Sequence, residues 1–166
     1  SLRLANVDCG ASQDLETKEA ISAEIAAQFP TGETVDFKFQ SGDNQRSGVF
    51  DTPSGPTKGL ILFVHGYGPS NVRGWNMYGD LRPRFNAVGF ATATWDKPGQ
   101  GQSSGTFDIN QSVYDSAEEV IAAADYLRQT GAPGSDNIGL WGVSRAGWIA
   151  PIALSQDYTL NFWISV

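Results

Sequence analysis

Residues 137–156, NIGLWGVSRAGWIAPIALSQ, place a short apolar run, a turn and a helical segment in direct succession. The apolar residues Ile138, Leu140 and Trp141 predict a strand that is covered on both faces, as strands inside a parallel sheet are. A helix is expected to begin immediately after Ser144, so that the serine hydroxyl group lies above the sheet at a helix N-terminus. A turn as sharp as this one strains the backbone at its centre.

The positions two residues before and after Ser144 must be small in such a turn. They are Gly142 and Ala146, so the sequence follows the pattern G-x-S-x-G except at the last position, and the glycine is displaced to Gly147. Alanine still meets the steric need. The pattern predicts a nucleophile elbow, and the strand before it and the helix after it favour that interpretation. The alternative is an ordinary strand-to-helix connection with a capping serine.

The composition is that of a globular protein. The 166 residues are 40% hydrophobic and 17% charged, which is enough for one domain with a core. The net charge of −7 argues against a nucleic-acid partner, which would need a basic face. No apolar run approaches about 20 residues, so no transmembrane helix is expected. The compartment, cytoplasmic or secreted/periplasmic, stays open.

The predicted elements are a strand pair followed by alternating strands and helices. Residues 1–33 are interpreted as an N-terminal extension with a short helix over 14–28, and residues 34–166 as the main domain. The order predicts an α/β protein with a mostly parallel sheet flanked by helices. Strands are expected at 34–40, 45–50, 59–64, 89–95, 138–141 and 160–166, with helices at 75–87, from Ser112 or Asp115 to before Gly131, and after Ser144.

Three sequence features stand in the order that is typical of the α/β-hydrolase fold. They are His65-Gly66-Tyr67-Gly68 after the third strand, Asp96-x-Pro98-Gly99-x-Gly101-x-Ser103 after the fourth, and the elbow at Ser144 after the fifth. The chain resembles the serine esterase and peptidase branch of that fold over roughly residues 34 to 166. The resemblance implies that Ser144 is the nucleophile and that the backbone N–H groups of Arg145 and Tyr67 form the oxyanion hole.

A complete catalytic triad is not found in these residues. In this fold the acid and the histidine follow the serine. The only histidine, His65, precedes Ser144 and lies in the proposed oxyanion turn, where a structural or substrate-lining role is expected for it. Asp157 is the only acid after the elbow and is interpreted as a solvated loop residue. Because the sequence stops inside an apolar strand, we expect a longer natural protein or a second chain that completes the sheet, and an inactive isolated chain.

Several other residues carry weaker expectations. The five tryptophans are expected in the core, although Trp148 and Tyr67 are placed to line an acyl pocket. The side chain of Arg145 is expected in solvent, and Asp96 is expected to hold the glycine-rich turn by hydrogen bonds. Gly99-x-Gly101 also begins a dinucleotide-binding pattern, but Ser104 replaces its third glycine, so no cofactor is expected, and no metal either.

The sequence therefore predicts a serine hydrolase that acts on carboxylic esters, thioesters or small amides through an acyl-enzyme on Ser144. The base and the acid of the triad would lie outside these residues. The alternative is a non-catalytic α/β-hydrolase-like binding or interaction domain, which keeps the elbow without the base. The motifs do not separate ester from peptide substrates.

Overall fold

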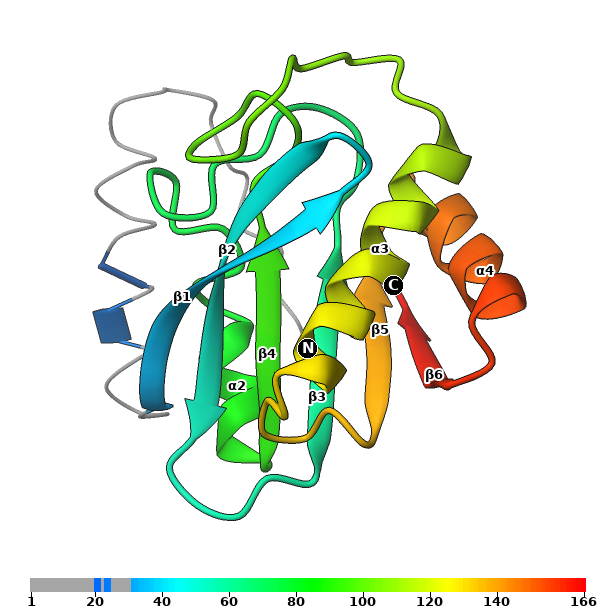
Figure 1. Cartoon of the computed structure of the whole chain (residues 1–166). Coiled ribbons are helices and arrows are strands. Elements are labelled where there is room, and N and C mark those ends of the chain that lie inside the picture. The colour runs from blue at the N-terminus through cyan, green and yellow to red at the C-terminus, as the bar shows by residue number, and fades with distance from the viewer. Residues whose placement is uncertain (1–19, 22, 25–30) are drawn as a thin grey trace, which may run out of the picture.

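A six-stranded sheet forms the centre of the molecule, with the strand order β1-β2-β4-β3-β5-β6 (Figure 1). The computed structural model describes residues 20–21, 23–24 and 31–166. The strands β4, β3, β5 and β6 pair in parallel, and β1 and β2 extend the sheet in antiparallel fashion. This arrangement confirms the predicted α/β class with a mostly parallel sheet. The strands are β1 (Thr31–Ser41), β2 (Asn44–Pro53), β3 (Gly59–Val64), β4 (Phe90–Trp95), β5 (Ile138–Gly142) and β6 (Leu160–Ser165), and the helices are α2 (Arg82–Ala87), α3 (Val113–Gln129) and α4 (Ala146–Gln156).

The helix predicted over 14–28 lies mostly outside the described residues, although residues 20–21 and 23–24 are helical. The division between an extension before residue 34 and a main domain stays a prediction. None of the helices in the described part of the chain is both long enough and apolar enough to cross a bilayer.

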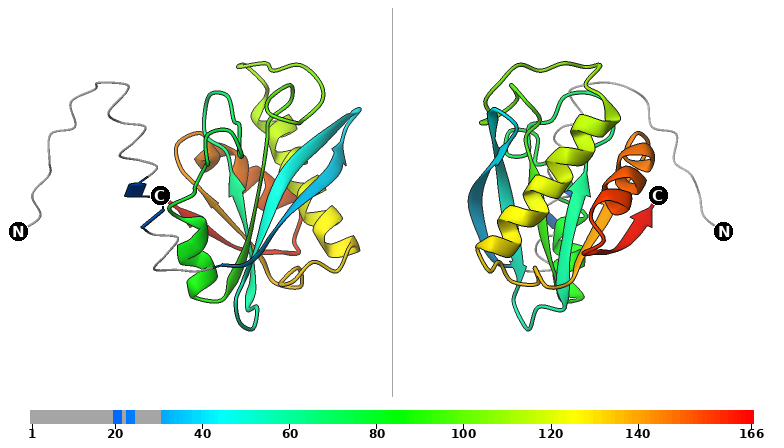
Figure 2. Two further views of the ribbon diagram at one scale, coloured as in Figure 1. Left: turned by 90° about the vertical axis from the view of Figure 1, so that its left-hand side faces the viewer. Right: turned by 45° about the vertical axis from the view of Figure 1, so that its right-hand side comes forward.

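Strand β3 lies inside the sheet and separates two layers of the core. Successive side chains of a strand point to opposite faces. Leu60, Leu62 and Val64 therefore pack in the large cluster that includes residues of α3 and α4, whereas Ile61 and Phe63 pack in a smaller cluster on the other face. Figure 2 shows α3 and α4 on one face of the sheet and α2 on the other. Because both faces are covered, all six residues of β3 are buried, as its unbroken apolar run predicts.

The helix predicted over 75–87 is wrong in its first half, because α2 begins only at Arg82. Asn76 and Tyr78 have φ angles of 45° and 57°, and this left-handed conformation interrupts a right-handed helix. In this conformation the ring of Tyr78 stacks on Phe63, with 4.8 Å between the ring centroids. Packing of one aromatic side chain has therefore outweighed the local helical pattern.

The tryptophans divide between the core and the surface. Trp95 and Trp141 are buried as predicted, but Trp75 and Trp148 are 56% and 74% exposed, so the core prediction is wrong for these two. Trp75 belongs to the irregular turn before α2. Helix α4 buries Ile149, Ala150 and Ala153. Trp148 lies on the opposite side of this helix because successive residues of a helix are about 100° apart.

Candidate active site

Ser144 lies in the turn between β5 and α4 and has a φ angle of 60°. A left-handed conformation is uncommon for a residue other than glycine, and strain of this kind, about 1–3 kcal/mol, is typically held at functional sites. The serine is exposed, so its hydroxyl group is open to solvent. Its Oγ atom makes no hydrogen bond to another residue of the described chain. The strained turn with an accessible serine at its centre is therefore confirmed.

Gly142 and Ala146 meet underneath this turn. A methyl group at Gly142 would lie only 2.4 Å from Cβ of Ala146 and 3.1 Å from the carbonyl oxygen of Val64. Position 142 therefore accepts no side chain while alanine occupies position 146. A methyl group at Gly147, in contrast, would meet no atom of the described structure within 4 Å. The steric requirement thus falls on the pair 142 and 146, and not on the displaced glycine.

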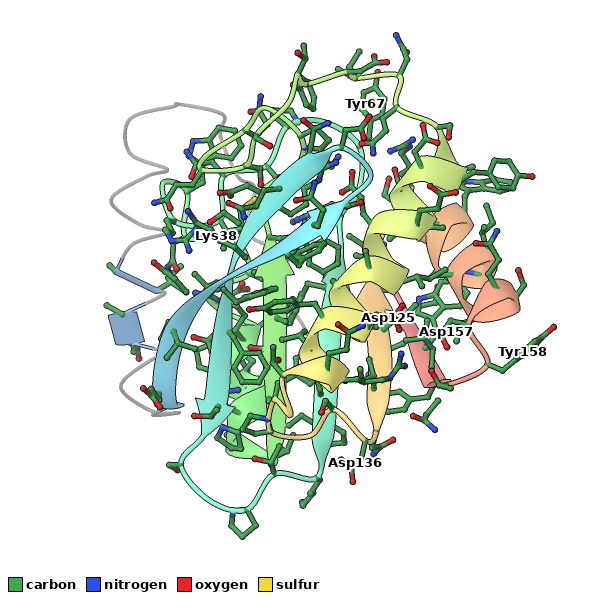
Figure 3. The ribbon with its side chains drawn as sticks, in the orientation of Figure 1. Lys38, Tyr67, Asp125, Asp136, Asp157 and Tyr158 are labelled. Carbon is green, nitrogen blue, oxygen red and sulfur yellow. The ribbon has the colours of Figure 1, made fainter. Side chains whose placement is uncertain are left out.

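The turn after β3 faces the elbow. β3 and β5 are neighbouring parallel strands, so the turns that follow them meet at the same edge of the sheet. A methyl group at Gly66 would lie 3.5 Å from the carbonyl oxygen of Val143 and 3.9 Å from Cβ of Ser144. The exposed side chain of Tyr67 lies at the end of the molecule where β4 finishes (Figure 3). The two turns that the sequence analysis connects are therefore adjacent.

The N–H groups of Tyr67 and Arg145 are the two predicted oxyanion donors. Neither of them donates a hydrogen bond to another group within the described residues. Arg145 precedes the first residue of α4, and N–H groups at a helix start have no partner inside the helix. Within the described residues, both N–H groups are therefore free to bind an anionic oxygen.

His65 is buried, and both nitrogen atoms of its ring are engaged. Nε2 donates to the carbonyl oxygen of Trp95, and Nδ1 accepts from the hydroxyl group of Tyr78 at 3.1 Å. Burial lowers the pKa of His65 from 6.5 to about 4; the hydrogen bond to Trp95 opposes this shift, and the charge of Lys97 adds to it. The ring is thus neutral and offers no free nitrogen to Ser144. Of the two roles expected for His65, these contacts favour the structural one.

The lowered pKa of His65 predicts a specific dependence of stability on pH. The unfolded chain takes up a proton near pH 6.5 and the folded chain only near pH 4, so the free energy of unfolding falls as the pH is lowered between these values. The free energy of unfolding of the wild type exceeds that of His65→Gln by an amount that depends on pH. This difference should be about 2–3 kcal/mol smaller at pH 4.5 than at pH 7. Urea unfolding of both proteins at the two pH values measures this, and a difference independent of pH would contradict it.

Lys97 is a residue of this site that the sequence analysis does not identify. Its Nζ atom donates hydrogen bonds to the carbonyl oxygens of Gly66 and Gly68. Burial lowers the pKa of Lys97 to about 8, helped by the nearby positive charge of Arg145 and opposed by the carboxylate of Glu119. The one feature of the sequence that could have pointed to Lys97 is its position directly after Asp96. A lysine in a turn is usually solvated, so nothing in the residue pattern places this side chain inside the protein.

Asp96 holds the glycine-rich turn, as the sequence analysis predicts. Its carboxylate accepts hydrogen bonds from the N–H groups of Val72, at 2.6 Å, and Gln102, at 2.9 Å. A methyl group at Gly101 would lie 2.2 Å from this carboxylate, which explains the glycine at that position. Asp96 therefore ties the turn after β4 to the segment that follows the predicted oxyanion turn.

The solvated position predicted for the side chain of Arg145 is wrong. Its guanidinium group donates to the carbonyl oxygen of Gln111 and to Oγ of Ser116, because the start of α3 lies close to the elbow. These contacts attach the residue after Ser144 to a neighbouring element. They leave its backbone N–H free.

The solvated position predicted for Asp157 is also wrong. Its carboxylate forms an ion pair with Arg128 of α3 at 3.1 Å and accepts hydrogen bonds from Thr159. Burial alone would raise the pKa of Asp157, but the hydrogen bonds from Thr159 and Arg128 outweigh it, and the pKa lies below its ordinary value. Figure 3 shows Asp157 away from Tyr67. Asp157 therefore joins α3 to the end of α4.

Residues 55–162 match the family model Hydrolase_4, which is described as serine aminopeptidase S33. A search of curated proteins gives no match. No group of three or more His, Cys, Asp or Glu residues that could hold a metal ion is found in the part of the chain that the structure describes.

Several solved structures share the fold at low sequence identity. An α/β-hydrolase, GrgF, from Penicillium sp. sh18 has a TM-score of 0.69 and 19% identity, over 80% of this chain and 45% of its own. An esterase from Pyrococcus furiosus has a TM-score of 0.64 and 19% identity, over 95% and 54%. A dienelactone hydrolase from Anabaena variabilis has a TM-score of 0.65 and 22% identity, over 80% and 62%.

These likenesses show the α/β-hydrolase fold. The chain spans between 45% and 62% of the length of the three solved chains. The family model covers more than half of this chain. The chain therefore belongs to the Hydrolase_4 family, serine aminopeptidase S33, of the α/β-hydrolase fold.

Proposed function

We propose that this chain carries the nucleophile and the oxyanion hole of a serine hydrolase that acts on carboxylic esters, thioesters or small amides. Ser144 Oγ attacks the acyl carbon, and its proton passes through a base to the leaving alcohol, thiol or amine. A water molecule then attacks the acyl-enzyme, and the carboxylic acid leaves as Ser144 regains its proton. The observation that carries the proposal is the exposed Ser144 at a φ angle of 60° opposite the turn at Gly66.

The oxyanion hole is the part of the mechanism that this chain supplies most fully. The tetrahedral intermediate carries a negative oxygen, and two fixed N–H donors stabilise it. The N–H groups of Tyr67 and Arg145 are free of other partners in the described chain and belong to the two adjacent turns. Losing one such donor typically costs about 3–4 kcal/mol of transition-state stabilisation.

The exposed aromatic side chains beside the elbow suggest where an acyl group would bind. Trp148 lies one helical turn beyond Ser144, and Tyr67 belongs to the facing turn. Both are strongly exposed, at 74% and 65%, so they offer apolar surface to a substrate. We propose that they line the acyl site. The structural relatives are named as an esterase, a dienelactone hydrolase and an α/β-hydrolase, and the family as an aminopeptidase, so ester and amide substrates both stay open.

The base that activates Ser144 is assigned to residues beyond this sequence or to a second chain. His65 is the only histidine among the 166 residues, and its ring is engaged by Trp95 and Tyr78. The chain also spans only about half of the solved structures that it matches. We accordingly expect the isolated 166 residues to be inactive.

The engaged ring of His65 also favours a second candidate function. A domain that keeps the elbow without a base would serve as a non-catalytic binding or interaction domain of the same fold. The two candidates differ in one respect that can be measured directly, which is whether Ser144 forms a covalent acyl intermediate.

Pre-steady-state hydrolysis of p-nitrophenyl acetate by the native protein distinguishes them. A serine hydrolase with slow deacylation releases a burst of about one equivalent of p-nitrophenol per active site before the steady state. Acetyl-thioester and acetyl-anilide substrates, tested next, define the substrate class. A native protein that gives neither a burst nor turnover above the buffer rate with any of the three would support the non-catalytic domain.

A further inference from the structure

The turn after β3 is wrapped around the ammonium group of Lys97. Nζ donates to the carbonyl oxygen of Gly66 at 2.7 Å and to that of Gly68 at 2.5 Å. The backbone N–H of Lys97 donates to Oγ of Ser70 at 2.6 Å. Lys97 is only 8% exposed. A single residue at the end of β4 therefore holds the proposed oxyanion turn at three points.

These contacts determine the direction of one backbone N–H group. The described residues contain no cis peptide bond, and in a planar trans peptide the C=O and N–H groups point in opposite directions. Because the carbonyl of Gly66 points toward Lys97, the N–H of Tyr67 in the same peptide points away from it. The carbonyl of Gly68 belongs to a peptide whose nitrogen is that of Pro69, which has no N–H. The N–H of Tyr67 is thus the one donor that the two carbonyl contacts orient.

We propose that Lys97 is a positioning residue of the oxyanion hole, which orients and polarises the Tyr67 peptide so that its N–H is a stronger donor to the oxyanion. A hydrogen bond from a cation to a peptide oxygen strengthens the bond that the N–H of the same peptide makes, because the bonds polarise one another. The inference rests on the proposed function of Ser144. Lys97 acts through the turn, and we assign it no contact with the substrate.

The charged surroundings of Lys97 are consistent with this role. The positive charge of Arg145 and the negative charge of Glu119 both act on its ammonium group. Glu119 is buried and forms an ion pair with Arg46 at 3.0 Å. Its negative charge is therefore shared between Arg46 and Lys97. Lys97 contacts the turn that carries the N–H of Tyr67, and Arg145 itself carries the second proposed donor, so a cationic side chain is associated with each of the two turns. An anionic intermediate is favoured in such surroundings.

The variant Lys97→Met tests the proposal, because methionine keeps an unbranched apolar stem and removes the charge and the donors. Lys58→Met is the matched control, since Lys58 also donates to a backbone carbonyl, that of Val88 at 2.9 Å, but is exposed and on another turn. In the native protein, kcat for p-nitrophenyl acetate should fall about a hundredfold in Lys97→Met, with KM within about twofold. Lys58→Met should change neither.

A second measurement does not need a reactive serine. With ¹⁵N-labelled tyrosine, each of the five tyrosines among these 166 residues contributes one amide signal, and Tyr67→Phe identifies the one from Tyr67. The Tyr67 amide resonance should shift in Lys97→Met and stay unchanged in Lys58→Met. If Lys97→Met does not fold, Lys97→Gln takes its place; it removes the charge and can donate to only one of the two carbonyls, so smaller changes in the same direction are expected.

The outcomes separate this inference from the proposed function. If the native protein reacts at Ser144 and a folded Lys97→Met keeps the wild-type kcat, the role of Lys97 is wrong and the proposed function stands. If the native protein does not react at all, the proposed function fails, and so does a role for Lys97 in catalysis. The Tyr67 resonance then decides the remaining part: a shift supports the orientation of this peptide by Lys97, and an unchanged resonance overturns it.

Discussion

Replacing Ser144 by alanine is expected to lower kcat of the native protein for ester hydrolysis by about 10⁵–10⁶-fold, because the acyl-enzyme can no longer form. The substitution removes one hydroxyl group from an exposed turn, and Oγ of Ser144 has no hydrogen-bond partner in the described chain. The free energy of unfolding should therefore change by less than about 0.5 kcal/mol. Loss of activity without loss of stability is the result that identifies a nucleophile.

Ser54→Ala is the matched control, because Ser54 is an exposed serine in the loop between β2 and β3. It should retain the wild-type kcat and KM. Steady-state kinetics and urea unfolding of the two variants and the wild type decide the matter. A Ser144→Ala protein that keeps more than about a tenth of the wild-type kcat would show that the reaction proceeds elsewhere.

Gly142→Ala is expected to lower both the activity and the stability of the native protein. The new methyl group would lie 2.4 Å from Cβ of Ala146, so β5 and the start of α4 must move apart and displace Ser144 between them. A displacement of about 1 Å at a reacting group typically costs about a hundredfold in rate. Overpacking of this kind also costs about 1–3 kcal/mol of stability. Steady-state kinetics and urea unfolding measure the two effects.

A double-mutant cycle tests whether the contact between positions 142 and 146 causes the loss of activity in Gly142→Ala. Ala146→Gly removes the opposing methyl group, and Gly142→Ala/Ala146→Gly should regain most of the activity that Gly142→Ala loses. The carbonyl oxygen of Val64, 3.1 Å from the added methyl group, keeps the recovery incomplete. Gly147→Ala is the control and should be neutral, because its methyl group meets nothing within 4 Å in the described structure. A double variant as inactive as Gly142→Ala would contradict the steric account.

The elbow and the buried strand β3 could be predicted because their constraints are local. An unbroken apolar run such as that of β3 fits a strand covered on both faces. The small residues at positions 142 and 146 follow from the geometry of one turn. The order of the three motifs then placed the turn at Gly66 opposite Ser144. Each of these inferences needs only neighbouring residues or the order of strands in the sheet.

The interruption of the helix predicted over 75–87 and the positions of the Lys97 and Arg145 side chains could not be predicted, because they depend on tertiary contacts. The pattern of residues 75–87 is helical, but Tyr78 adopts a left-handed conformation that packs its ring on Phe63 of a different element. Lys97 and Arg145 are charged residues that a sequence places in solvent. Their partners, the carbonyls of Gly66 and Gln111, are backbone groups about 30 residues away or more, which leave no trace in a residue pattern.

The central claim is that Ser144 is the nucleophile of a serine hydrolase. Intact mass spectrometry of the native protein before and after treatment with a fluorophosphonate tests it most directly, because this probe phosphonylates an activated serine. We predict a gain of one phosphonyl group per active site, which peptide mapping locates on Ser144 and which Ser144→Ala abolishes while Ser54→Ala does not. A native protein that gains no adduct, or gains it at another serine, would contradict the account.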